Sequence, residues 1–93
     1  MTIFDQISVR IIKEQESIIG PMAWDEAKKV PGFTIINQQN GEVSLVDDNV
    51  EILNNLVTQY AKLFGMASTI ACKEAVQDLI AELPPDQIPT SLK

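Results

Sequence analysis

The chain has 93 residues, with 7 Lys and Arg against 13 Asp and Glu, a net charge of −6, one Cys and no His. This length suits one small domain, and a hydrophobic content of 45% is enough to order one core. A lone Cys excludes a disulfide framework within the chain, and the lack of His excludes Ser-His and Cys-His nucleophile pairs and imidazole metal ligands. A membrane-spanning helix needs about 20 consecutive apolar residues, and the sequence contains no such run.

The first residues do not look like an export signal, because Asp5, Arg10, Lys13 and Glu14 interrupt any apolar stretch. A signal peptide needs an uncharged apolar core of about 7–15 residues. Together with a single thiol, this predicts a cytoplasmic protein with no membrane partner.

The charge is unevenly distributed along the chain. No basic residue occurs between Lys29 and Lys62, whereas this window contains Glu42, Asp47, Asp48 and Glu51. We therefore expect a negative field at one end of the molecule. The net charge of −6 disfavours attraction to nucleic acid or to anionic lipid.

A first helix is predicted from Thr2 to Ile19, with Phe4, Ile7, Ile11 and Ile18 near one apolar stripe. Val9 and Ile12 fall on a second face. A helix that is apolar on more than one side is usually buried from more than one side. In so short a chain, we expect another subunit to be able to supply the second cover.

Gly20-Pro21 ends this helix and starts a second one, since Pro is favoured at the first helical position. The second helix carries Trp24 on its apolar side. It ends before Pro31-Gly32, because the residue before a Pro is disfavoured in the α conformation.

A β-hairpin follows, with strands at 33–36 and 42–46. Its connection contains Asn40-Gly41, a pair favoured in primed turns that need positive φ angles. Alternation places Phe33 and Ile35 on one face with Val43 and Leu45. A lone hairpin is marginal in water, so it must pack on the helices, and its free edges could pair with those of a second copy.

The third helix is predicted to begin at a capping box from Asp48 to Glu51. The helix carries inward apolar residues at i, i+3, i+4 spacing: Ile52, Leu53, Leu56, Val57, Tyr60, Leu63 and Phe64. Gly65 suits a left-handed residue at its end. A last helix is predicted from Ala67 to Leu83, before Pro84-Pro85.

This element order predicts an α+β domain with two N-terminal helices, a β-hairpin and an antiparallel pair of C-terminal helices. We expect a single domain over residues 1–85 and an irregular C-terminal tail over residues 86–93, with Ile88 and Leu92 placed to dock.

No group of residues in the sequence indicates catalysis. Cys72 falls on an inward stripe and has no His to act as its base, so a buried structural thiol is expected. The acidic run from Asp47 fails as an EF-hand, because Ile52 and Thr58 stand where the loop needs Gly and Glu. No glycine-rich phosphate loop is present. The sequence therefore predicts a protein that is not an enzyme, with no catalytic residues, no cofactor and no metal.

A helix-turn-helix through 59–80 is one alternative, because Ala61, Gly65, Met66 and Ser68 match the spacing of such units. Glu74 departs from it, standing where an apolar residue is expected. The exposed face would offer Ser68, Thr69 and Lys73 to DNA, with only one positive charge. Phosphate contacts supply most non-specific affinity, so this composition disfavours a nucleic-acid partner.

The leading hypothesis is a small acidic protein-interaction or regulatory module that pairs with itself or with another protein. Its candidate interface comprises five apolar residues: Ile3, Val9, Ile12, Trp24 and Ile36 at the hairpin edge. The second hypothesis is a small-ligand site between helices and hairpin, in an apolar pocket lined by Phe33, Ile35, Tyr60 and Phe64.

Overall fold

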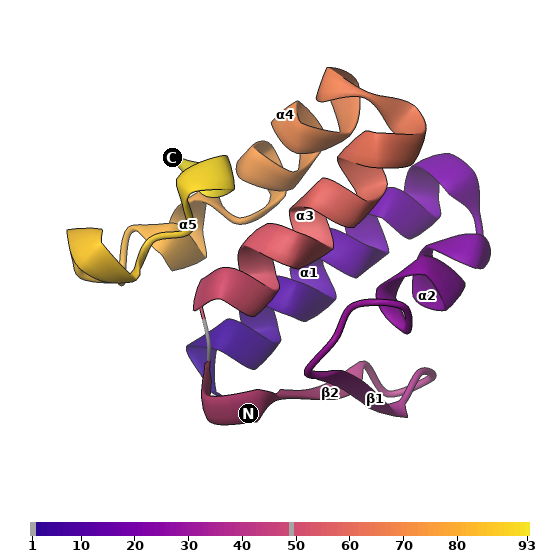
Figure 1. Ribbon diagram of the computed structural model, residues 1–93, viewed down its shortest axis with the longest axis horizontal. Coiled ribbons are helices and arrows are strands. Elements are labelled where there is room, and N and C mark those ends of the chain that lie inside the picture. Colours follow the sequence, from indigo (N-terminus) through magenta and orange to yellow (C-terminus); the bar gives the residue numbers. More distant parts are fainter. Residues whose placement is uncertain (1, 49) are drawn as a thin grey trace.

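The computed structural model describes residues 2–48 and 50–93. Along the chain, helices precede a two-stranded hairpin and further helices follow it (Figure 1). The elements are α1 (Ile3–Ile19), α2 (Met22–Ala27), β1 (Phe33–Asn37), β2 (Glu42–Leu45), η1 (Val46–Asp48), α3 (Val50–Phe64), α4 (Met66–Ala75), α5 (Gln77–Ile80), η2 (Pro85–Gln87) and η3 (Thr90–Leu92), where η marks a 3-10 helix. The α+β class and the element order predicted from the sequence are confirmed.

α1 is the central helix, because α2, α3, α4, α5 and β2 all pack against it. It begins with a capping box: the Asp5 N–H donates to Thr2 Oγ1 at 3.2 Å, and the Thr2 N–H donates to the Asp5 carboxylate at 3.1 Å. Ile7, Ile11 and Ile12 are fully buried. The cover over Ile12, which the sequence led us to expect from another subunit, therefore comes from the chain itself.

The hairpin has the predicted facing. Phe33 pairs with Leu45 and Ile35 pairs with Val43, and this face packs on α1. The register shifts between Ile35 and Asn37, so Ile36 is an extra residue with no partner of its own in the ladder.

The turn of the hairpin differs from the primed turn that Asn40-Gly41 favoured. Among the described residues other than glycine, only Asp47 has a positive φ, so Asn40 lacks the angle that a type I′ turn requires. The Gly41 N–H donates to the Gln38 carbonyl at 3.3 Å, and the Asn40 N–H donates to Asn37 Oδ1 at 3.1 Å. The Asn37 side chain thus holds a longer turn in place.

α3 and α4 pack together as the predicted pair, joined by Gly65 alone. Gly65 has φ 78° and ψ −165°, so its φ is positive as predicted, although its ψ is extended. Gly20, between α1 and α2, has nearly the same angles, φ 80° and ψ −163°.

The two glycine connections also share their hydrogen bonds. Each glycine N–H donates to the carbonyl four residues earlier at 2.8 Å, from Glu16 for Gly20 and from Ala61 for Gly65. Each glycine carbonyl accepts from the N–H three residues later at 3.1 Å, from Ala23 and Ser68 respectively. The chain therefore turns from α1 into α2 and from α3 into α4 by the same device.

The last helix is not continuous as predicted, because it breaks at Val76, whose φ of −117° separates α4 from α5. Arg10 Nη1 donates to the Ala75 carbonyl at 3.1 Å and to Asp78 Oδ1 at 2.8 Å. The Arg10 guanidinium thus donates to the Ala75 carbonyl, which in a continuous helix would accept a backbone N–H from the next turn.

The C-terminal tail docks on α3 and α4 through η3. Leu92 is buried and Ile88 is partly buried, and Ser91 donates to Asn54 Oδ1 from its N–H at 3.0 Å and from its hydroxyl at 2.6 Å. The capping box predicted from Asp48 to Glu51 lies outside the described residues, since it depends on Asn49 and on the Asp48 side chain.

Candidate interaction surface

The structure does not bring the five predicted interface residues together on one exposed face. Ile12 and Trp24 are core residues, and Ile3 and Val9 are half-buried against that core. Ile36 is 63% exposed at the register shift of the hairpin. Of the predicted interface, only Ile36 is largely available to a partner in this structure.

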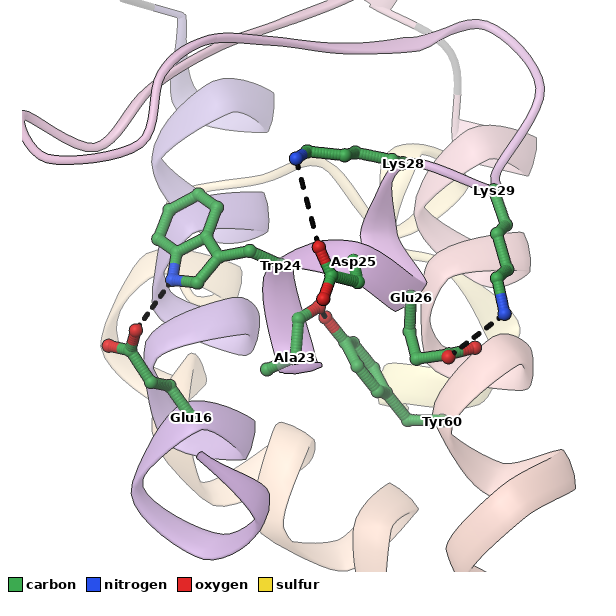
Figure 2. A network of polar contacts seen from close by, with 8 residues as sticks. All are labelled: Glu16, Ala23, Trp24, Asp25, Glu26, Lys28, Lys29 and Tyr60. Atoms are coloured by element: carbon green, nitrogen blue, oxygen red, sulfur yellow. Dashed lines mark hydrogen bonds and ion pairs between the residues drawn. The ribbon is translucent and has the colours of Figure 1, made fainter. Parts of the chain in front are cut away.

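Trp24 is held within the chain by its ring nitrogen as well as by burial. Its Nε1 donates to Glu16 Oε2 at 2.8 Å, and the neighbouring Ala23 carbonyl accepts a 2.6 Å bond from the Tyr60 hydroxyl (Figure 2). Tyr60 is fully buried, and this burial raises the pKa of its hydroxyl. These two bonds tie α2 to α1 on one side and to α3 on the other.

Glu26 forms a second link between α2 and α3. Its two carboxylate oxygens accept from Gln59 Nε2 at 2.8 Å and from Lys29 Nζ at 3.0 Å. The bonds from Gln59 and then Lys29 lower the pKa of Glu26, so this carboxylate is ionised at neutral pH. This ionised carboxylate, held at both oxygens, links α2 to Gln59 of α3 and to Lys29.

A buried polar group joins α1 to α4. Gln15 Nε2 donates to the Ser68 carbonyl at 3.3 Å and to Cys72 Sγ at 3.4 Å. Within the described residues Gln15 Oε1 has no hydrogen-bond partner, although the side chain is fully buried. Burial raises the pKa of the Cys72 thiol to about 11, so it is protonated at neutral pH. The prediction of a buried Cys72 is confirmed.

Of the eight large apolar side chains that are exposed among the described residues, all but Ile36 and Val46 lie in two stretches of sequence without a charged residue, 17–24 and 63–72. These two stretches contribute six large apolar residues that are between 38% and 77% exposed: Ile18, Met22, Leu63, Phe64, Met66 and Ile70. We call this set the uncharged end.

The two stretches lie at the same end of the helices. Gln15, in the last turns of α1, contacts Ser68 in the first turn of α4, and Tyr60, in the last turns of α3, contacts Ala23 in α2. Figure 1 shows the connection from α1 to α2 and the connection from α3 to α4 on the same side of the molecule, at the upper right of this view.

The residues of the uncharged end are exposed because the apolar faces of α1 and α3 continue beyond the part of each helix that the core covers. Periodicity placed Ile18 and Phe64 on inward stripes, yet both are exposed, since the chain turns away at Gly20 and at Gly65. In α4 the arrangement is reversed: the small polar residues Ser68 and Cys72 face inward and the larger Met66 and Ile70 face outward. Neither signal in the sequence identifies this surface: periodicity places Ile18 and Phe64 inside, and residues 30–41 and 52–61 lack charge as well without belonging to it.

Acidic residues gather at the other end of α3. The hairpin, η1 and the first turn of α3 contain Glu42, Asp47 and Glu51. α3 has 15 residues, which separates this region from Gly65 by about 22 Å at 1.5 Å per residue. The exposed Val46, which adjoins Asp47 in η1, therefore lies beside an acidic residue.

The residues of the predicted ligand pocket line neither of the two hollows described below. Phe33 and Tyr60 are buried in the core, whereas Phe64 belongs to the uncharged end. One surface hollow of about 170 Å³ is lined by Lys29, Val30, Pro31, Asn55, Thr58, Gln59 and Lys62. Another, of about 220 Å³, is lined by Gln6, Val9, Arg10, Lys13 and Leu79. Both hollows contain two cationic side chains.

The structure of α3 and α4 differs from a helix-turn-helix in two ways. The connection between α3 and α4 is one residue long, whereas a helix-turn-helix uses about 3–4. Ser68, expected on the DNA-facing side, is buried, and the outward face of α4 carries Met66 and Ile70 instead. That face is apolar rather than basic.

Comparisons with known proteins identify no relative: no family model, no curated protein and no solved structure matches the chain. Among the described residues, no cluster of three or more acidic or Cys side chains is placed to hold a metal ion. None of the helices in the described part of the chain has the length and apolar character needed to cross a bilayer.

Proposed function

We propose that this protein is a small, non-catalytic interaction module of the cytoplasm that pairs with a second copy of itself through the uncharged end. The observation that carries the proposal is the meeting of two charge-free stretches, 17–24 and 63–72, at one end of a chain in which 22% of residues are charged. Charged residues are depleted in the centres of protein interfaces, where Met and aromatic residues are enriched.

The area exposed at this end suits an interface. At about 200 Å² for a fully exposed large side chain, the six apolar residues together expose roughly 600 Å². A typical specific interface buries about 800 Å² on each partner, and the rim around apolar residues supplies part of this. A patch of this size lies at the upper limit for soluble monomers, about 300–600 Å².

The distribution of charge allows a second copy as the partner. Two chains of net charge −6 repel each other, and contact at the uncharged end keeps the acidic residues around Asp47 and Glu51 far apart. An apolar patch is also complementary to itself, as the two-fold interface of a homodimer requires. A basic partner would favour the acidic end instead.

Sedimentation equilibrium over a range of concentrations tests the proposal. We expect a monomer–dimer equilibrium that strengthens with salt. Between about 0.1 M and 1 M NaCl the screening length falls from about 10 Å to about 3 Å, which removes the repulsion while leaving the apolar contact. A protein that remains monomeric at millimolar concentration in both salts would contradict self-association.

Two matched variants locate the interface. Met66→Glu and Ile36→Glu each replace an exposed apolar residue, 77% and 63% exposed, and each adds one negative charge. The net charge therefore changes equally in both. We expect Met66→Glu to weaken dimerisation at least about tenfold, since a carboxylate would be buried without a partner. Ile36→Glu should leave it within about twofold of the unmodified chain. The reverse order would place the interface at the hairpin edge.

A further inference from the structure

The hollow of about 170 Å³ lies between α3 and the segment that follows α2. Lys29, Val30 and Pro31 line one side of it. The other side is α3, which contributes Asn55, Thr58, Gln59 and Lys62 at i, i+3, i+4 and i+7. This spacing puts the four polar side chains on one face of the helix. The lining holds two ammonium groups, two amides and one hydroxyl, and no carboxylate.

Three of the lining side chains carry hydrogen-bond donors that are not used within the described residues. Within residues 2–48 and 50–93, the side chains of Asn55, Thr58 and Lys62 make no hydrogen bond or ion pair. No acidic residue lies one helical turn from Lys62 along the chain, because positions 58 and 59 in α3 and positions 65 and 66 after it are uncharged. An ammonium, a hydroxyl and an amide are thus aligned along one helix face without partners among the described residues.

Glu26 limits what the rest of the lining can bind. Its carboxylate accepts from Gln59 Nε2 at 2.8 Å and from Lys29 Nζ at 3.0 Å, so these two lining residues already have an anionic partner. Counting Lys29 and Lys62 against Glu26, the hollow keeps one net positive charge in a chain of net charge −6. Lys62, Thr58 and Asn55 are therefore the groups left to contact an incoming anion.

We propose that this hollow binds a phosphate group, either as free inorganic phosphate or as the phosphate of a small monoester. The volume holds five or six waters at about 30 Å³ each, which is room for the five heavy atoms of one phosphate group. A phosphate presents three strong acceptor oxygens and close to two negative charges at neutral pH. Three free donors, one of them the Lys62 ammonium, match those three acceptors better than they match the two coplanar oxygens of a carboxylate.

Amide NMR spectra of the full chain test this site. We expect inorganic phosphate, added at constant ionic strength, to shift the amides of residues 29–31 and 55–62 in a saturable way. Acetate in a parallel titration should shift them less. Glycerol 3-phosphate is the third ligand: tighter binding than phosphate would assign the site to a monoester, and equal or weaker binding to the free anion. No saturable shift with either phosphate, or equal shifts with acetate, would overturn the proposal.

Charge-matched variants give the second readout. Lys62→Gln removes the unpaired ammonium from the proposed phosphate site. Lys13→Gln removes an ammonium from the hollow of about 220 Å³, which lies elsewhere on the molecule. We expect Lys62→Gln to weaken phosphate binding about fivefold and Lys13→Gln to leave it within about twofold. Thr58→Val, which removes the hydroxyl at nearly constant volume, should also weaken binding. Equal phosphate affinities for Lys62→Gln and Lys13→Gln would show that phosphate responds only to the overall charge of the protein, and would overturn the proposed site.

Discussion

Replacing Gly65 by Ala tests whether the chain reverses into α4 through a backbone conformation that only glycine adopts readily. With φ 78° and ψ −165°, Gly65 lies in a region that carries a strain of about 1–3 kcal/mol for a residue with a side chain. A Cβ atom at this position would meet no heavy atom within 4 Å, so steric contact adds nothing. Ala also restricts the unfolded chain, which offsets about 0.4–1 kcal/mol.

The net effect expected for Gly65→Ala is a loss of about 1–2 kcal/mol in the free energy of unfolding. For a domain of this size, each kcal/mol lowers the melting temperature by about 4–8 °C. Gly20→Ala should give the same loss to within about 0.5 kcal/mol, because Gly20 has the same angles and the same free space around a Cβ.

Urea unfolding followed by circular dichroism, at low protein concentration, measures both losses without a contribution from dimerisation. Ser17→Ala, at an exposed position of α1, is the control and should change stability by less than about 0.5 kcal/mol. An unchanged or raised midpoint for Gly65→Ala, or clearly different losses at Gly20 and Gly65, would refute the shared backbone conformation.

Three further predictions concern the polar groups of the core. Tyr60→Phe should lower the free energy of unfolding by about 1–2 kcal/mol, because the buried Ala23 carbonyl loses its 2.6 Å bond; a loss below about 0.3 kcal/mol in urea unfolding would contradict this. Gln15→Met should change stability by less than about 1 kcal/mol, since relief of the buried Oε1, which has no partner in the described part of the chain, offsets the loss of the 3.3 Å bond to the Ser68 carbonyl; a loss above about 2 kcal/mol would show that the amide is essential. Stability should fall as pH rises from 9 to about 11, because the folded chain holds the Cys72 proton more tightly than the unfolded chain does. Cys72→Ala should be less stable at neutral pH but should lose less between these pH values, and equal slopes in pH-dependent unfolding would refute the assignment.

Local signals in the sequence were enough to predict most of the fold. The glycine and proline positions mark the ends of α1, α2 and α3, and the alternation of Phe33, Ile35, Val43 and Leu45 gives the facing of the hairpin. These features depend on residues close together in the chain, so they can be derived without knowing the tertiary structure.

Features that depend on distant residues could not be predicted in this way. The break at Val76 involves Arg10, which lies 65 positions from the carbonyl it contacts at Ala75. Periodicity also shows which side of a helix a residue faces, but not whether another element covers that side. This is why Ile18 and Phe64 were expected inside and are exposed, whereas Ile12 was expected at an interface and is covered by its own chain.

The candidate surface was visible in the sequence only in part. The charge-free stretches 17–24 and 63–72 can be read directly from the residues, but so can 30–41 and 52–61, which do not belong to this surface. The meeting of 17–24 and 63–72 at one end requires the packing of α1, α2, α3 and α4 that the structure shows. The unpartnered donors of Asn55, Thr58 and Lys62 likewise become a site only when α3 packs beside the segment that follows α2.

The most direct test of pairing through the uncharged end is a dilution series followed by amide and methyl NMR of the isotopically labelled full chain. We predict that concentration-dependent shifts map to residues 17–24 and 63–70, including the methyl groups of Met22 and Met66, and that the hairpin residues 33–45 keep their positions. Shifts confined to the hairpin, or a spectrum that does not change from micromolar to millimolar concentration, would contradict this account.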